Sequence, residues 1–443
     1  MHSSHQAEAG RPGLARVAFA VIVGSALEWY DFFLFGIATA TIFNKIFFPS
    51  DAPLLSTLAA FSTFAVGFLA RPIGGILLAA WSDKYGRQSI LVSSLILMGL
   101  TSTLIGFVPT YEQAGIFAPI LLIVLRILQG IGAGVEYAIA AIYALEHHDE
   151  RRRGLAGSFP GIGVYLGMAL ATLALQAAAW FTGEHFLSWG WRLPFMASAI
   201  LLVLGFYIRL SLKESPEFEK VKAAGKISER PLTDLLRHEK RGVLTVFGAQ
   251  LAQTGLGYLF SVFGLFYLTD VLHLSRSLAL QTNLIASIVG IFVVPLAGWF
   301  GNQVGARRGY LVVLVFCIFV SLIFFPMQDT REPTWIYAAR ILAVGIGVAS
   351  LVAIQGAYFS ACFSTSVRTS GFVLGREVSV ALGGGLTPLI ATLLYDWAGI
   401  SAVIALAVFL GGASLATVML SNAGRKSTAI ADDQTVGGMV KPS

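Results

Sequence analysis

Two carboxylates, Glu28 and Asp31, lie three residues apart in the first long apolar segment of the chain. That spacing places both side chains on one face of a helix. A charged side chain at mid-bilayer costs at least about 2.5 kcal/mol, so it normally faces a water-filled interior and acts there. We expect at least one of the two to carry a proton, and we favour Asp31 because it lies deeper. The alternative is a structural ion pair with a neighbouring helix.

A later apolar segment carries Arg126, Gln129, Glu136 and Tyr137. At about 100° per residue, Arg126, Gln129 and Tyr137 share nearly one helical stripe, which can line a cavity. An arginine keeps its proton in a protein, so a buried Arg126 needs either a carboxylate partner or a bound anion, which it can hold bidentately. Both interpretations stay open: a standing ion pair with a carboxylate such as Glu136, or an anion site that protonation of a carboxylate releases.

Two further groups of polar residues stand in apolar segments nearer the C-terminus. The adjacent pair Arg376 and Glu377 offers a second candidate for proton carriage in Glu377, against simple pairing between helices, and a candidate for substrate binding in Arg376. Gln250 and Gln253 begin a polar stripe that can hydrogen-bond a hydroxylated solute or join helices. No histidine lies inside an apolar segment, so proton chemistry at membrane depth would use carboxylates.

The aromatic residues are expected to lie mostly at the lipid-facing or interfacial surface. Tyr30, Tyr137 and Tyr165 are the exceptions, because each can stack on a ring-shaped ligand.

The composition indicates a membrane protein that positions these residues on spanning helices. Of the 443 residues, 56% are hydrophobic and 12% are charged, against roughly 25% charged residues in a soluble globular protein. Twelve apolar segments are long enough to cross a bilayer, which needs about 20 residues. They are 17–42, 55–80, 89–108, 117–145, 155–181, 190–212, 242–269, 279–300, 309–327, 335–362, 369–395 and 399–421.

The distribution of basic residues predicts the orientation of these spans. With the N-terminus inside, 21 Lys and Arg residues fall in inside connectors and tails and three fall outside, a strong positive-inside bias. The prediction is a cytoplasmic tail over 1–16, a six-helix bundle over 17–212, a cytoplasmic linker over 213–241, a second bundle over 242–421 and a cytoplasmic tail over 422–443. Weak similarity between the halves indicates a duplicated unit.

Several catalytic and binding chemistries have no motif in this chain. There is no phosphate-binding loop and no triad of hydrolase residues at membrane depth, so an enzyme or an ATP-driven pump is not expected. Cys317 and Cys362 show no metal-ligand spacing, so we expect neither a metal nor a cofactor. The net charge of +6 resides in connectors, which does not favour a nucleic-acid partner.

The connector after the second span, Trp81-Ser-Asp-Lys-Tyr-Gly-Arg87, resembles the signature loop of the major facilitator superfamily. Glu28-Trp-Tyr-Asp-Phe32, Arg126-Ile-Leu-Gln-Gly130 and Trp189-Gly-Trp-Arg-Leu-Pro-Phe195 are similar to segments of its metabolite:proton symporter branch. Within that branch, the segments most similar to the shikimate carriers are Thr57-Leu-Ala-Ala-Phe61, Leu187-Ser-Trp-Gly-Trp-Arg-Leu-Pro-Phe195 and Gly383-Gly-Gly-Leu-Thr-Pro-Leu-Ile-Ala391. The resemblance implies an all-α fold of twelve spanning helices in two pseudo-symmetric six-helix bundles that rock about a central site. It also implies that Asp83 and Arg87 act as gate residues.

The resemblance implies proton symport of a small carboxylated metabolite across the inner membrane by a protein that acts as a monomer. Arg126 would hold the substrate carboxylate, with Gln129 and Gln253 as hydrogen-bond partners, and Asp31 would carry the proton, with Glu28, Glu136 and Glu377 as alternatives. Three rival functions stay open: a carrier of zwitterions such as proline or betaine, an efflux antiporter, and a non-transporting receptor.

Overall fold

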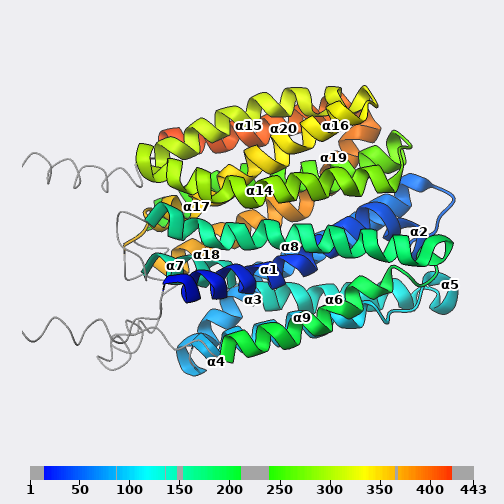
Figure 1. Cartoon of the computed structure of the whole chain (residues 1–443), viewed down its shortest axis with the longest axis horizontal. Helices are drawn as coiled ribbons and strands as arrows, with labels where there is room; N and C mark the ends of the chain where they lie inside the picture. The colour runs from blue at the N-terminus through cyan, green and yellow to red at the C-terminus, as the bar shows by residue number, and fades with distance from the viewer. Residues whose placement is uncertain are drawn as a thin grey trace, which may run out of the picture.

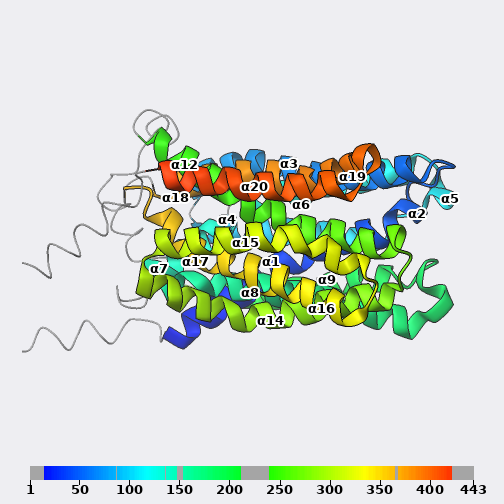
Figure 2. The same ribbon diagram turned by 90° about the horizontal axis from the view of Figure 1, so that it is seen from above.

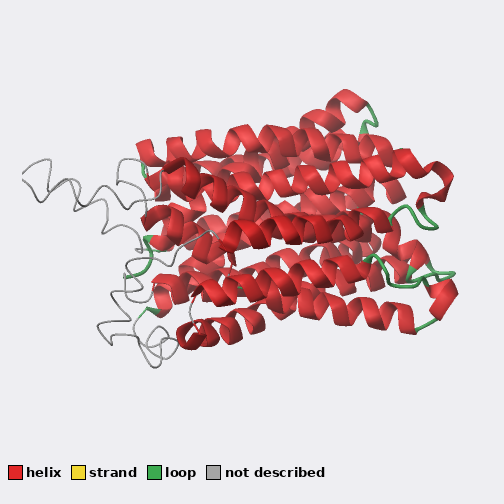
Figure 3. Ribbon diagram, turned by 60° about the horizontal axis from the view of Figure 1, so that its bottom comes forward, coloured by secondary structure: helices red, strands yellow, loops and turns green. Residues whose placement is uncertain are grey.

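The computed structural model describes residues 14–85, 87–134, 136–146, 153–210, 239–364 and 368–421. Within these ranges every regular element is helical, and the long helices run side by side (Figure 3). Nine helices of the described residues are long and apolar enough to cross a membrane, and three shorter apolar helices accompany them. Each of the twelve predicted spans overlaps one of these helices.

The first half of the chain contains six spans, three of which are interrupted or extended by short helices (Figure 1). In order they are α1 (Leu14–Ala38) with η1 (Thr39–Phe43) and α2 (Asn44–Ile46); α3 (Pro53–Tyr85); α4 (Arg87–Ile105); α6 (Phe117–Ala133) with α7 (Glu136–Glu146), preceded by the short α5 (Tyr111–Ala114); α8 (Arg153–Thr182) with η3 (Gly183–Phe186); and α9 (Arg192–Leu210).

The second half repeats this plan. Its elements are α12 (Lys240–Tyr258) with η4 (Leu259–Phe263), α13 (Gly264–Phe266) and η5 (Tyr267–Val271); α14 (Arg276–Val304); α15 (Ala306–Asp329); α16 (Pro333–Arg340) with η6 (Ile341–Val348) and α17 (Ala349–Ser360); α18 (Arg368–Ser379) with η7 (Val380–Gly385) and α19 (Leu386–Ala398); and α20 (Ile400–Leu420). We call the end of the bundle at which α12 begins and α20 ends the linker end (Figure 2).

Helices of the two halves meet along the middle of the molecule. In the described residues, α8 packs against α14 and α17, while α3 packs against α18, η7 and α19. At the end opposite the linker end, Lys45 forms an ion pair of 3.6 Å with Asp270. Nearer the linker end, the Gly154 amide donates to Asn302 Oδ1 at 3.3 Å. The halves are therefore in contact at both ends.

Small residues allow α3 and α6 to approach backbone to backbone. A Cβ added to Gly130 would lie 2.0 Å from the carbonyl oxygen of Gly67, and one added to Gly74 would lie 2.1 Å from the carbonyl oxygen of Ile131. Glycine is the residue that fits where two helices come this close. The close contact fixes the two polar residues that these helices carry into the interior, Arg71 and Arg126.

Five of the described segments have π-helical geometry, and they lie in the first, seventh, tenth and eleventh spans. A π-turn disturbs the regular ladder of backbone hydrogen bonds and often marks a functional site. In η4 the Phe260 carbonyl accepts a hydrogen bond from Nη1 of Arg340, which is fully buried. Nε and Nη2 of Arg340 have no hydrogen-bond partner.

Candidate functional site

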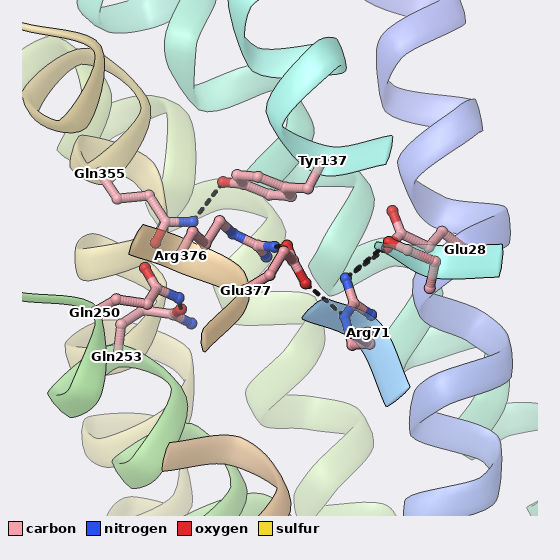
Figure 4. Close-up of polar contacts among 9 residues, drawn as sticks. Glu28, Arg71, Tyr137, Gln250, Gln253, Gln355, Arg376 and Glu377 are labelled. Atoms are coloured by element: carbon pink, nitrogen blue, oxygen red, sulfur yellow. Dashed lines mark hydrogen bonds and ion pairs between the residues drawn. The ribbon is translucent and has the colours of Figure 1, made fainter. Parts of the chain in front are cut away.

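A row of four alternating charges crosses the centre of the molecule (Figure 4). Arg71 Nη2 lies 3.2 Å from Glu28 Oε1, and Arg71 Nε lies 2.8 Å from Glu377 Oε2. The other oxygen of Glu377, Oε1, accepts a hydrogen bond from Arg376 Nη1. We call these four residues the charge ladder. Since Glu28 and Arg71 belong to the first half and Arg376 and Glu377 to the second, the Arg71–Glu377 contact joins the halves.

The charge ladder is completely enclosed. Its four side chains are at most 3% exposed, and the Arg71 Nη2 group also donates to the Ala133 carbonyl at 3.1 Å. Every charge in the ladder has an opposite charge in direct contact, which is what makes burial of ionised groups tolerable. Arg71 Nη1 is nevertheless without a hydrogen-bond partner.

A second cluster lies entirely in the first half and is built differently. Arg126 Nη1 donates to Gln129 Oε1, and Gln129 Nε2 donates to Ser102 Oγ at 2.5 Å. Asp31 Oδ1 accepts a hydrogen bond from Ser198 Oγ at 2.7 Å. We call these five residues the Arg126 cluster. Its cation and its carboxylate are both bonded to neutral side chains.

Arg126 has no ion pair with any carboxylate in the described part of the chain, and its Nε and Nη2 groups are without a hydrogen-bond partner. The guanidinium is fully buried and its Cζ stands 3.9 Å from the centroid of the Phe35 ring. A Cβ on Gly67 would lie 2.7 Å from Nη2 of Arg126, so this glycine makes room for the cation. The standing ion pair that we kept as one interpretation is absent here.

Aromatic rings connect the two groups of charges. The Phe32 centroid lies 4.7 Å from Cζ of Arg71 and 5.3 Å from Cζ of Arg126. Phe32, Phe35, Phe64 and Phe68 are all buried, so the expectation that aromatic residues are mostly lipid-facing is wrong for this region. Their faces attract the guanidinium groups, which have few other partners at this depth.

Tyr258 of the seventh span stands among the arginines. Its buried hydroxyl has no hydrogen-bond partner and lies within electrostatic range of Arg71, Arg126 and Arg376. Its ring packs against Phe64 and Phe68 at centroid distances of 5.4 and 5.0 Å. An unpaired buried hydroxyl on which three positive charges act is suited to an anionic or hydroxylated ligand.

The glutamines and one tyrosine of the predicted site form pairs close to the ladder (Figure 4). Gln355 Nε2 donates to Tyr137 Oη at 2.5 Å, and the Tyr137 ring centroid lies 4.1 Å from Cζ of Arg376. Gln250 Nε2 donates to Gln253 Oε1 at 2.5 Å. Gln250 Oε1 has no hydrogen-bond partner. The first pair joins the tenth span to the fourth, whereas the second lies within the seventh span.

Two predicted aromatic residues serve contacts between helices instead. The Tyr30 hydroxyl donates to the Pro194 carbonyl at 2.8 Å, and the Tyr165 hydroxyl donates to the Val344 carbonyl at 2.8 Å. Glu136 is buried at the start of α7. Asp83 and Arg87 belong to α3 and α4, but their side chains lie outside the part of the chain that the structure describes.

Charge is balanced in the interior as a whole. Among the described residues, the buried charged side chains comprise four arginines and four carboxylates, namely Arg71, Arg126, Arg340 and Arg376 with Glu28, Asp31, Glu136 and Glu377. The described residues contain no group of three His, Cys, Asp or Glu side chains that could hold a metal ion.

Sequence reasoning missed Arg71 and Tyr258. Arg71 precedes Pro72 in the second span and is as deep in apolar sequence as Arg126 is, so its position was a usable signal. Tyr258 follows Gly257 on the polar side of the seventh span, where an aromatic residue gives no specific signal.

Comparison with known proteins identifies the family. The model of the Major Facilitator Superfamily matches residues 21–376. The chain is 36% identical to the inner membrane metabolite transport protein YhjE of Escherichia coli (strain K12), over 92% of this chain and 94% of that protein. It is 34% identical to the shikimate transporter of the same strain, over 86% of this chain and 88% of that protein.

Other similarities agree with this result. The proline/betaine transporter of Escherichia coli (strain K12) is 31% identical, over 86% of this chain and 78% of that protein. The solved structure of the proton:xylose symporter XylE bound to 6-bromo-6-deoxy-D-glucose has the same fold, with a TM-score of 0.73 at 14% identity over 92% of this chain and 94% of that one. The predicted fold class is confirmed. The relatives of the chain are transporters and not enzymes. The chain is a multi-pass membrane protein that belongs to the Major Facilitator Superfamily.

Proposed function

We propose that this protein is a proton-coupled symporter that imports a small carboxylated metabolite by alternating access. The observation that carries the proposal is the state of Arg126, a fully buried guanidinium with two nitrogens that have no partner. Such a cation is unstable in an apolar interior unless an anion binds to it. A carboxylate matches the free donors of a guanidinium in charge and in planar shape.

Asp31 is the proton carrier in this proposal. It is buried, and its hydrogen-bond partner is the neutral hydroxyl of Ser198. A carboxyl group with no direct cation can bind a proton as well as release one. Because Asp31 and Arg126 belong to the same cluster, binding of a substrate anion to Arg126 and binding of a proton to Asp31 favour each other.

The remaining site residues have supporting roles. Gln129 holds Arg126 in position, while Gln253 and Tyr258 supply hydrogen bonds from the second half. Glu28, Glu136 and Glu377 are the alternative proton carriers. We also propose that the bundles cover 17–212 and 242–421, that the linker end faces the cytoplasm of an inner-membrane monomer, and that Asp83 and Arg87 gate this end.

The relatives support a small-molecule substrate without choosing it. One relative is named for shikimate, and others are named for proline and betaine. The choice between an acid and a zwitterion therefore depends on the site, where the unpaired Arg126 favours a net negative substrate.

The test is transport by the purified full-length protein in liposomes that contain a pH-sensitive dye. Shikimate, 2-oxoglutarate, citrate, benzoate, proline and betaine are added one at a time outside. Internal acidification with one of the acids is the expected result and names the substrate class. Empty liposomes and liposomes treated with a protonophore are the controls.

Other outcomes would replace the proposal. Alkalinisation of proton-loaded vesicles would indicate an efflux antiporter, and no pH change with any solute by folded protein would remove symport. Acidification with betaine alone would indicate the second candidate, a zwitterion carrier.

A further inference from the structure

Arg71 of the charge ladder has the properties of a ligand-binding arginine, although its partners are now protein carboxylates. Two of its hydrogen-bond partners, Glu28 and the Ala133 carbonyl, belong to the first half. The third, Glu377, belongs to the second half. The Nη1 group of Arg71 has no hydrogen-bond partner, although the side chain is fully buried. Arg71 therefore has one free donor before any contact is broken.

The ladder allows the two halves to separate from each other, because each half contains one complete ion pair. If the Arg71–Glu377 contact opens, Arg71 keeps Glu28 as a partner within the first half. Glu377 keeps Arg376 as a partner within the second half. Each half therefore retains a neutral ion pair, and no charge is left without an opposite neighbour, which is the costly outcome for a buried pair.

Opening of that contact would also prepare a binding site. It frees Arg71 Nε, while Nη1, on the other edge of the guanidinium, stays available as before. The Arg71 guanidinium that Glu377 leaves stays against the aromatic ring of Phe32, whose centroid lies 4.7 Å from its Cζ. A carboxylate that binds to Nε restores the lost charge contact.

We propose that Arg71 is a substrate-carboxylate site of this transporter, which Glu377 occupies in the closed, substrate-free protein and which the substrate carboxylate takes over from it. Glu377 is then an internal competitor of the substrate, and its displacement releases the second half from the first. This inference rests on the proposed function, because it requires an acid as substrate. It adds a second cationic contact to that of Arg126 and gives the ladder a part in the transport cycle.

The experiment measures equilibrium binding of radiolabelled shikimate, 2-oxoglutarate, citrate and benzoate to purified full-length protein. Glu377→Gln removes the competitor's charge and keeps its size, so the Kd of the bound acid should fall about tenfold. Arg71→Gln should raise that Kd at least about tenfold. In the double variant, Glu377→Gln should give no further gain, because the arginine on which it acts is absent.

Matched controls separate these effects from general loss of charge. Glu332→Gln and Arg308→Gln make the same chemical changes at exposed positions and should leave the Kd unchanged. If Arg71→Gln does not fold, Arg71→Lys tests the same point, since it keeps the charge but lacks the planar fork. It should raise the Kd several-fold.

The failures of the two proposals can be told apart. Wild-type protein that binds an acid, together with a Glu377→Gln variant whose Kd is unchanged or higher, would overturn the inference and leave the symport proposal standing. The same follows if Arg71→Gln binds as the wild type does. If the folded wild type binds none of the four acids, both proposals are wrong.

Discussion

The charge ladder and the Arg126 cluster each bring a guanidinium to the Phe32 ring, and they treat buried charge in opposite ways. In the ladder every charged group touches an opposite charge, and the row crosses from one half to the other. In the Arg126 cluster the cation and the carboxylate have neutral partners, and all five residues belong to one half. The difference teaches that the ladder's charges satisfy one another across the two halves, whereas neither charge of the cluster has an opposite charge in direct contact.

The largest effect is expected from removal of Arg126, the cation of the Arg126 cluster. Arg126→Gln should lower substrate uptake by at least about 100-fold, because a buried charge-assisted contact to the substrate carboxylate is lost. Arg126→Lys should retain part of the activity, since it keeps the charge without the bidentate geometry. Initial rates of uptake into liposomes measure both. Wild-type rates in Arg126→Gln would end the assignment of this cluster to substrate binding.

Asp31→Asn sharpens the comparison by separating binding from coupling. A neutral amide cannot release a proton, so accumulation against a gradient should be abolished while exchange of pre-loaded substrate continues. Uptake and counterflow measured on the same liposome preparation give the two quantities. Loss of both in a folded variant would move Asp31 from proton coupling to substrate binding.

The same two regions should differ in stability. Arg71→Gln leaves Glu28 buried without its cation and should lower the free energy of unfolding by about 3 kcal/mol. Arg126→Gln removes a guanidinium that has no opposite charge, so its effect on the free energy of unfolding should be less than about 1 kcal/mol. Chemical denaturation in mixed micelles compares the variants. Equal losses would mean that Arg126 is compensated as fully as Arg71 is.

The smallest effect is expected at the glycine that makes room for Arg126. Gly67→Ala would place a methyl group 2.7 Å from the guanidinium, which must shift away from Gln129 and the Phe35 ring. A shift of this kind should reduce uptake about fivefold. Gly412→Ala is the matched control, because no atom lies within 4 Å of the added Cβ. A fivefold loss in both variants would show that the defect is general.

Much of this architecture was predictable because the bilayer restricts it. Apolar length alone located all twelve spans, since a crossing helix needs about 20 apolar residues. The sequence also pointed to Glu28, Asp31, Arg126 and Glu377, because a charged group in an apolar span requires a reason to be there.

Partners across helices were not predictable in this way. The contact of Arg71 with Glu377 joins residues 306 positions apart, and no periodicity within one span reports on a neighbour in another. The contact of Arg376 with Glu377 depends on side-chain conformations that bring adjacent residues together. The unpaired hydroxyl of Tyr258 is likewise a property of its surroundings and not of its own helix.

The distribution of the ladder's charges along the chain has a consequence for biosynthesis. Glu28 and Arg71 belong to the first two spans, so each charge finds its opposite as soon as the second span has been made. Arg376 and Glu377 are adjacent in one helix and meet without any other span. The Glu28–Arg71 pair and the Arg376–Glu377 pair can therefore each enter the lipid as a neutral ion pair. Of the three ion-pair contacts in the ladder, only Arg71–Glu377 forms after the ribosome has delivered the eleventh span and the two halves have docked.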